Sequence, residues 1–262
     1  MADVVVRNAR FHVQRLGEGA PTVVFLHGLV MDNLSSWYFT VANHVAKKSS
    51  VLLYDLRGHG RSERTPTGYS VPEMVSDLHA LLQSECPDER VVLVGNSFGG
   101  LLALAFAVAH PESVAGLVLV DAHWSDEGWA DKMVSTLALK GTERDEKIAD
   151  AFQHWLGRHS ERKRNRLAQN AEQLVYETSL LTDLQDSPVC TADQLAAVSV
   201  PVLALYGDQS DIRDRGTRLA ALLPQCTLEW LPECTHSILW EATETIRERI
   251  IAWVETLRRA AP

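Results

Sequence analysis

The residues best placed to do chemistry lie in Gly95-Asn96-Ser97-Phe98-Gly99, between two apolar segments. Residues 91–94 favour a strand and residues 101–109 a helix, and this strand, tight turn and helix is the setting in which Gly-x-Ser-x-Gly presents a nucleophile. We expect glycine to be required at both ends, because side chains on either side of so sharp a turn would collide. The pattern predicts that the Ser97 hydroxyl stands above a sheet, beside the free N–H groups of a helix start.

A serine hydroxyl attacks at neutral pH only with a base in hydrogen-bond reach and an acid that orients the base. His236, which follows the last predicted strand, is the base that we expect. The acid should lie on the loop after the preceding strand, where Asp211 is favoured because it has more room to turn back toward the histidine. Asp208, which directly follows that strand, and Asp121, at the end of another strand, are the alternatives.

A tetrahedral intermediate would also need donors for its oxyanion, and losing one such donor typically costs roughly a hundredfold in rate or more. The N–H of Phe98 is placed for this role because it follows the nucleophile. The loop His27-Gly28-Leu29 ends another predicted strand, and we expect the N–H of Leu29 to supply the second donor.

The elements that must position these residues alternate along the chain. Most of the apolar runs are uninterrupted, as in parallel strands that are covered on both faces, and amphipathic helical segments separate them. The sequence predicts an α/β fold with a mostly parallel sheet of about eight strands flanked by helices. The expected strands are residues 4–6, 11–15, 22–26, 51–54, 91–94, 116–120, 202–206 and 227–231.

The alternation is interrupted once, after the sixth strand. Residues 123–198 contain no convincing strand and favour three or more helical segments, around residues 126–140, 143–156 and 160–181. We therefore expect a core of residues 1–122 and 199–262 with an all-helical cap of residues 123–198.

These features together resemble the α/β-hydrolase fold superfamily. The resemblance is carried by the serine elbow, His236 and three further motifs, namely His27-Gly28, Asp55-Leu56-Arg57-Gly58-His59-Gly60-Arg61-Ser62 and residues 207–211. It implies a Ser-Asp-His triad, in that chain order, under a helical cap. The chain departs from the pattern at Ser210, where many relatives carry the acid three residues after the glycine.

A serine at the elbow favours acyl transfer to water through an acyl-enzyme. We expect a serine hydrolase that cleaves a carboxylic ester or thioester on Ser97, without a metal or organic cofactor. A carbon–carbon bond hydrolase of ring-cleavage products or a lactonase with the same triad is the alternative. The elbow resembles that of the carbon–carbon hydrolases, but it is also seen in plain esterases. A ligand-binding receptor without catalysis is a more remote one.

The cap should set the substrate. The candidates to line an apolar pocket are Trp124, Trp129, Met133, Phe152, Trp155 and Tyr176, although such residues also simply pack cap helices together. Five basic residues, Arg158, Arg162, Lys163, Arg164 and Arg166, favour a solvated helix face or, as a sharper hypothesis, a docking patch for an acyl-carrier protein.

Composition limits the partners. The 262-residue chain has a net charge of −9, which argues against nucleic acid as a partner. Its four cysteines lack metal-site spacing and predict reduced thiols. We recognise no signal peptide, and the longest apolar run, residues 98–109, is too short to cross a bilayer, so a cytoplasmic protein without membrane association is expected.

Overall fold

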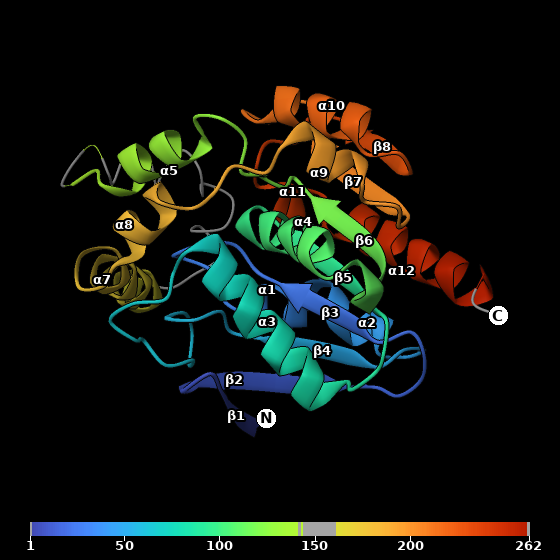
Figure 1. Ribbon diagram of the computed structural model, residues 1–262, viewed down its shortest axis with the longest axis horizontal. Coiled ribbons are helices and arrows are strands. Elements are labelled where there is room, and N and C mark those ends of the chain that lie inside the picture. Colours follow the sequence, from blue (N-terminus) through green and yellow to red (C-terminus); the bar gives the residue numbers. More distant parts are fainter. Residues whose placement is uncertain (1, 141–142, 144–160, 261–262) are drawn as a thin grey trace.

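The computed structural model describes residues 2–140, 143 and 161–260, and its centre is one sheet of eight strands (Figure 1). Every strand expected from the sequence is present, within a residue or two of its predicted bounds. The strands are β1 (Ala2–Val6), β2 (Ala9–Leu16), β3 (Val23–Leu26), β4 (Val51–Tyr54), β5 (Val91–Asn96), β6 (Val114–Val120), β7 (Val202–Gly207) and β8 (Cys226–Leu231).

The strand order is β1-β2-β4-β3-β5-β6-β7-β8. The hairpin β1–β2 is antiparallel and joins β4 in an antiparallel pair, and every other neighbouring pair is parallel. This confirms the predicted fold class. Because the parallel strands share one direction, the loops after β3, β5, β6, β7 and β8 all leave the same edge of the sheet, where ligands bind in open α/β folds.

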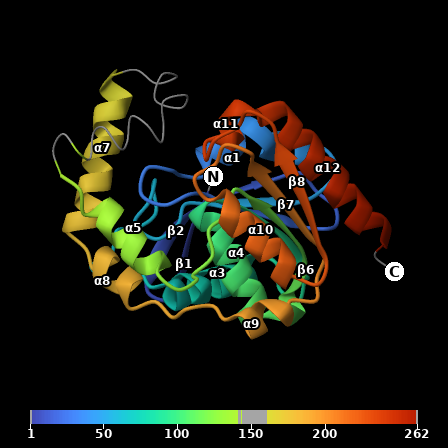
Figure 2. The ribbon, with the colours of Figure 1, turned by 90° about the horizontal axis from the view of Figure 1, so that it is seen from above.

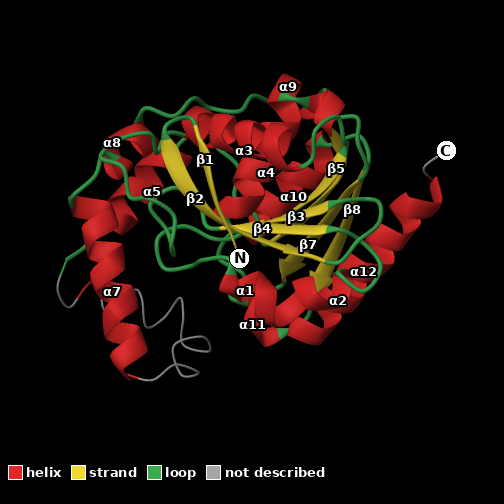
Figure 3. Ribbon diagram, turned by 90° about the horizontal axis from the view of Figure 1, so that it is seen from below, coloured by secondary structure: helices red, strands yellow, loops and turns green. Residues whose placement is uncertain are grey.

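Helices cover both faces of the sheet (Figure 3). Successive side chains of a strand point to opposite faces, so Val24 and Leu26 of β3 join the core under α3 and α4, whereas Val23 and Phe25 join the core under α1, α2 and α12. Uninterrupted apolar strands are thus explained by burial on both sides. The covering helices are α1 (Ser35–Trp37), α2 (Asn43–Val45), α3 (Val71–Glu85), α4 (Phe98–Ala109), α10 (Arg213–Leu222), α11 (Ile238–Glu241) and α12 (Thr243–Ala260), with the π-helical turn Tyr38–Ala42 and the 3₁₀ turn Pro111–Ser113.

The described residues between β6 and β7 form helices joined by loops and contain no strand, as predicted. It contains α5 (Trp129–Leu137), α7 (Glu161–Tyr176), α8 (Leu180–Gln185) and α9 (Ala192–Ala196). Helices α5, α7 and α8 lie together at one end of the molecule (Figures 1 and 2). The predicted helix at residues 143–156 lies outside the described residues except for Glu143, and the division into core and cap domains stays a prediction.

Helix length and the state of the thiols bear on the expectations drawn from composition. Within the described ranges, no helix is both long and apolar enough to cross a bilayer. All four cysteines, Cys86, Cys190, Cys226 and Cys234, are free thiols.

The apolar side of α12 should contribute strongly to stability. Ile250 is fully buried against the sheet, so we expect Ile250→Ala to lower the free energy of unfolding by about 2–5 kcal/mol through the cavity that it leaves. The neighbouring Arg249 makes only an exposed ion pair with Glu229, and Arg249→Ala should cost less than about 1 kcal/mol. Urea denaturation of both variants measures the difference, and equal costs would contradict this account of α12.

Candidate active site

Ser97 occupies the sharp turn between β5 and α4. Its backbone has φ 54° and ψ −117°, a left-handed φ that a non-glycine residue rarely adopts. A Cβ at Gly95 would lie 2.3 Å from the carbonyl oxygen of Gly99, and a Cβ at Gly99 would lie 2.2 Å from that of Leu26. The prediction that both positions require glycine is therefore confirmed, and the reason is close backbone approach.

His236 lies on the loop between β8 and α11, and its imidazole links two other side chains. Its Nε2 is 2.9 Å from the Ser97 hydroxyl oxygen, and its Nδ1 is 2.6 Å from Oδ2 of Asp121. The three residues come from three different loops at the same edge of the sheet. They form one continuous chain of hydrogen bonds from a hydroxyl to a fully buried carboxylate.

The carboxylate that contacts His236 is thus Asp121 and not Asp211, the residue that we favoured from the sequence. The Asp211 side chain is 69% exposed and lies 3.9 Å from the Lys132 ammonium. Asp208, the first alternative, makes no hydrogen bond to His236, and its Oδ1 has no partner in the described part of the chain. The expectation that Asp211 could turn back toward His236 was wrong. The loop after β7 is held by backbone hydrogen bonds from the Asp208 N–H to Leu231 and from the Gln209 N–H to Cys234.

Strand adjacency explains why the end of β6 can supply the carboxylate. Strands β6 and β7 pair directly, with Val120 opposite Leu205, so their last residues lie side by side. Asp121 adopts φ 42° immediately after β6. Its Oδ1 accepts the Gly207 N–H at 2.9 Å, and its Oδ2 accepts the Ser210 hydroxyl at 2.6 Å. Ser210 therefore donates a hydrogen bond to Asp121. It stands three residues after Gly207, where many relatives carry the acid.

The loop after β3 has one backbone donor without a hydrogen-bond partner among the described residues. The N–H of Gly28 donates to Asp32, that of Val30 to His59 Nε2 at 2.7 Å, and that of Met31 to the Leu29 carbonyl. The last bond closes a three-residue turn centred on Val30, whose φ is 66°.

Leu29 is then the one residue among 28–31 whose N–H makes no hydrogen bond to a described group. The N–H of Phe98, at the first turn of α4, has no intrahelical partner either. Leu29 and Ser97 line the same small hollow. The oxyanion hole of Leu29 and Phe98 stays a prediction.

Two buried histidines, His27 and His59, hold this loop through hydrogen bonds to its backbone. Nε2 of His59 accepts a hydrogen bond from the Val30 N–H. Its Nδ1 therefore carries the proton and donates to the Arg57 carbonyl at 2.8 Å. His27 uses the same pattern between the Leu56 N–H and the Gly28 carbonyl. Burial lowers the pKa of His59 to about 3, which keeps it neutral and able to accept.

The electrostatic environment suits His236 to accept a proton. Burial is the largest effect and would lower its pKa, but the hydrogen bond and charge of Asp121, with the charge of Asp211, outweigh it, so the pKa of His236 is raised above its usual value. The neighbouring His123 has its ring centroid 5.3 Å from that of His236. Burial, together with the charges of His236, Arg215 and Lys132, holds the pKa of His123 well below the usual range, so it is neutral.

His236 forms part of the wall of two hollows. The smaller, of about 60 Å³, is lined by Gly28, Leu29, Met31, Asp32, Asn96, Ser97, His236, Ser237, Leu239 and Trp240. The larger, of about 400 Å³, is lined by His123, Trp129, Lys132, Met133, Thr136, Gln209, Asp211, Arg215, Thr235 and His236.

The structure brings some of the predicted pocket residues to the site and not others. Trp129 and Met133 of α5 line the larger hollow. Trp124 is buried and faces a different surface hollow with Asp126 and Arg218, and the Tyr176 hydroxyl donates to the Leu139 carbonyl at 2.9 Å without lining either hollow at His236.

Several predicted residues lie beyond what the structure describes. Phe152, Trp155 and Arg158 lie outside the described residues, as do the side chains of Arg162, Lys163 and Arg164. The docking patch for an acyl-carrier protein therefore stays a prediction.

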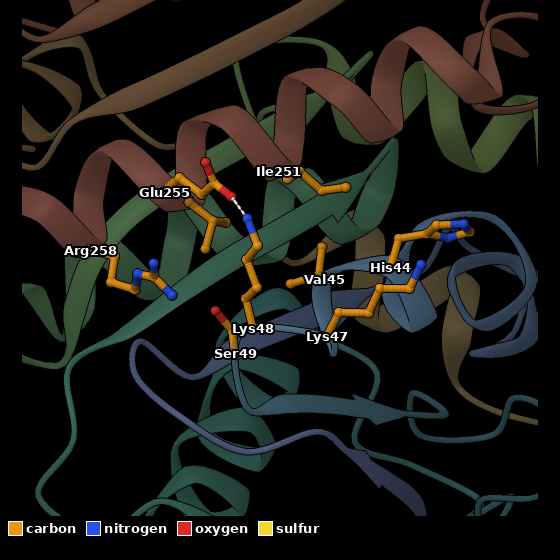
Figure 4. A pocket seen from close by; sticks show the side chains of 9 residues that line it. His44, Val45, Lys47, Lys48, Ser49, Ile251, Glu255 and Arg258 are labelled. Atoms are coloured by element: carbon orange, nitrogen blue, oxygen red, sulfur yellow. Dashed lines mark hydrogen bonds and ion pairs between the residues drawn. The ribbon is translucent and has the colours of Figure 1, made fainter.

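Other parts of the described chain offer less chemistry. Among the described residues, no group of three or more His, Cys, Asp or Glu side chains is arranged to hold a metal ion. A hollow of about 160 Å³ lies between α2 and α12 (Figure 4), where Lys48 reaches across to pair with Glu255. It contains none of the residues of the hydrogen-bond chain.

Comparison with known proteins agrees with this fold. The family described as alpha/beta hydrolase fold matches residues 21–243, and the chain belongs to that family. A 2-hydroxy-6-oxononadienedioate/2-hydroxy-6-oxononatrienedioate hydrolase from Cupriavidus pinatubonensis is 27% identical over 92% of this chain and 89% of its own length.

Two further relatives carry other hydrolase names. The lipase LipV from Mycobacterium tuberculosis is 40% identical, but over 42% of this chain and 41% of that protein. The structure of an esterase from Rhodococcus superposes with a TM-score of 0.79 at 23% identity, covering 97% of this chain and 98% of that one. The chain is therefore a member of a hydrolase family whose named relatives cleave different bonds.

The two candidate acids can be separated by pH profiles of ester hydrolysis. The base must be neutral, so kcat/KM should rise with pH through the raised pKa of His236 to a plateau. Asp211→Asn removes a charge that raises this pKa, so the rise should move to lower pH while the plateau changes less than about threefold. Asp121→Asn should lower the plateau by about 10³- to 10⁴-fold, because the imidazole loses its orienting partner.

The opposite pattern, with the plateau lost in Asp211→Asn and kept in Asp121→Asn, would return the role to Asp211. Thermal melting of both variants is the control, since a loss of activity counts only where the variant remains folded.

Proposed function

We propose that this protein is a serine hydrolase that cleaves a carboxylic ester or thioester through an acyl-enzyme on Ser97. The observation that carries the proposal is the unbroken hydrogen-bond chain from the Ser97 hydroxyl through His236 to the buried Asp121. A hydroxyl, an imidazole and a carboxylate in this order are what nucleophilic acyl transfer requires.

In the proposed mechanism His236 Nε2 takes the Ser97 proton while Oγ attacks the carbonyl carbon of the substrate. The N–H groups of Leu29 and Phe98 stabilise the oxyanion, and Asp121 stabilises the imidazolium. When the intermediate collapses, the acyl–oxygen or acyl–sulfur bond breaks and His236 returns the proton to the leaving atom. Water then enters, is deprotonated by His236 and releases the carboxylic acid.

The size of the smaller hollow supports a short acyl group. This hollow holds the attacking oxygen and the proposed oxyanion donor, so the acyl chain must lie in or beside it, and Met31, Leu239 and Trp240 close it on the apolar side. Met31 also packs against Leu167 and Ala171 of α7. The cap helix thus limits the space for the acyl chain.

Carbon–carbon bond hydrolysis is the second candidate, favoured by the similarity to the dienedioate hydrolase over 92% of the chain. A dioate bears a carboxylate at each end. Among the described residues, the smaller hollow is lined by Asp32 and by no lysine or arginine, so they give no charge partner to a carboxylate beside Ser97. This charge distribution supports the ester or thioester over the dioate.

An activity panel with covalent labelling tests the proposed function. A fluorophosphonate probe should label the wild type and leave Ser97→Ala unlabelled, because only the activated hydroxyl attacks phosphorus. Short-chain 4-nitrophenyl esters and acyl thioesters should be turned over, and a 2-hydroxy-6-oxo-dienedioate should be turned over at less than about one hundredth of their kcat/KM. A protein that cleaves the dienedioate best and the esters poorly would favour the second candidate, and absence of labelling would exclude the hydrolase.

Acyl-chain length provides a separate test of the smaller hollow. We expect kcat/KM for 4-nitrophenyl esters to fall at least about tenfold from butyryl to octanoyl, since an acyl chain that overfills a packed site forces costly displacements. Met31→Ala should reduce this fall by opening the apolar wall, whereas Val5→Ala, at an exposed valine on β1, should leave it unchanged. A flat chain-length profile in the wild type would contradict the assignment of the acyl site.

A further inference from the structure

The C-terminal end of α7 is attached to the core beside the loop that precedes α3. Leu174 is buried and belongs to the same core cluster as Tyr69. A Cβ at Gly58 would lie 2.7 Å from Leu174 Cδ1, so this glycine leaves the space that the leucine occupies. The Arg64 guanidinium donates a hydrogen bond to the side-chain oxygen of Gln173 at 2.7 Å. This end of the helix is therefore held by both apolar and polar contacts.

Helix α8, which follows α7, is fixed to the same loop through the carboxylate of Asp183. Its Oδ2 accepts the N–H of Gly68 at 3.1 Å, the N–H of Tyr69 at 2.8 Å and the hydroxyl of Ser179. The N–H of Ser179 in turn donates to the Pro66 carbonyl at 2.9 Å. Hydrogen bonds to a carboxylate are stronger than those between neutral groups, so Asp183 should be the main polar contact of α8 with the core.

The attached end of α7 and the wall of the smaller hollow lie on one face of this helix. Leu167, Ala171 and Leu174 follow each other at intervals of four and three residues, which places them on one side of α7. Leu167 and Ala171 pack against Met31, and Met31 lines the hollow that contains the Ser97 hydroxyl. These three residues of α7 span only about two turns. A shift of the helix at Leu174 would therefore also displace the two residues that pack against Met31.

We propose that Asp183 is a positioning residue that sets the length of the acyl chain which the enzyme accepts. It lines neither hollow at His236, and it acts by clamping α8, and with it the end of α7, to residues 66–71. The clamp keeps α7 against Met31 and so keeps the apolar wall of the smaller hollow closed. The inference rests on the proposed ester or thioester hydrolysis and adds to it a determinant of specificity outside the hollow.

The ratio of kcat/KM for 4-nitrophenyl octanoate to that for 4-nitrophenyl butanoate tests this proposal. Asp183→Ala should raise the ratio at least about threefold, because a released α7 lets Met31 give way to the longer chain. Asp183→Asn should stay close to the wild type, since the amide oxygen can still accept the two backbone N–H groups. Both esters are measured on one preparation, so a partial loss of folded protein lowers both rates together and leaves the ratio unchanged.

Two further variants of the same helix region make the test specific. Asp186→Ala changes an exposed aspartate at the C-terminal end of α8 and is the matched control, which should keep the wild-type ratio. Ser187→Ala removes the hydroxyl that accepts the Val71 N–H at 3.0 Å. It loosens the same attachment less, so we expect a smaller rise in the ratio, and it keeps the test available if Asp183→Ala does not fold.

A double-mutant cycle with Met31→Ala tests the route by which Asp183 acts. If the carboxylate works through the packing of α7 on Met31, Asp183→Ala should change the ratio by less than about twofold once Met31 is an alanine. Two substitutions whose effects on the ratio simply multiply would show that Asp183 acts by another route, and the proposal would be wrong.

The outcomes separate this inference from the function on which it rests. If neither ester is hydrolysed, the proposed function fails. If the butanoate is hydrolysed but Asp183→Ala and Asp186→Ala give the same ratio, the positioning role is wrong and the hydrolase remains. The same conclusion follows if Asp183→Ala does not fold and Ser187→Ala keeps the wild-type ratio. Equal rates for the two esters in the wild type would overturn the acyl site and this inference together, and would leave ester hydrolysis itself intact.

Discussion

The hydrogen bond between His236 Nδ1 and Asp121 Oδ2 is the contact on which the arrangement of the site depends. A fully buried carboxylate is stable only when its oxygens are satisfied. Asp121 meets this condition with three donors, namely the imidazole, the Gly207 N–H and the Ser210 hydroxyl. Two of these donors come from the end of β7, so the pairing of β6 with β7 fixes the carboxylate. Because this carboxylate holds the His236 imidazole, the position of the imidazole follows from the order of strands in the sheet.

The sequence could predict the parts of this site that local pattern determines. Ser97 and its two glycines belong to one strand-turn-helix, and His236 follows the final apolar strand. The carboxylate partner of His236 could not be predicted, because β6 and β7 are neighbours and either of the loops that follow them could place an aspartate beside the imidazole. Asp121 and Asp211 each follow a strand in the sequence, and only the fold of the loop after β7 turns Ser210 inward and Asp211 outward. The serine at position 210 was the available signal, since a missing acid there implies that another strand supplies it.

The polar motif of residues 55–62 was also visible in the sequence, but its purpose was not. It holds the loop after β3 through carboxylate and imidazole acceptors. Asp55 takes the N–H groups of Leu34 and Arg61, and His59 takes that of Val30. Asp55 lies 21 residues from Leu34 and His59 lies 29 residues from Val30, so no local periodicity reveals these two contacts. Their effect is to occupy neighbouring N–H groups and leave that of Leu29 for a ligand.

Backbone strain is concentrated at this edge of the sheet. Non-glycine residues with positive φ occur in each of the four loops that form the site, at Val30, Ser97, Asp121 and Glu233. Each such conformation costs about 1–3 kcal/mol and persists only where surrounding structure enforces it. Here the enforcing structure is the parallel sheet, in which β5 and β6 end immediately before Ser97 and Asp121. Placing donors and acceptors on strained turns held by a rigid core means that they need not reorganise as charge develops, which is the condition for strong electrostatic stabilisation of a transition state.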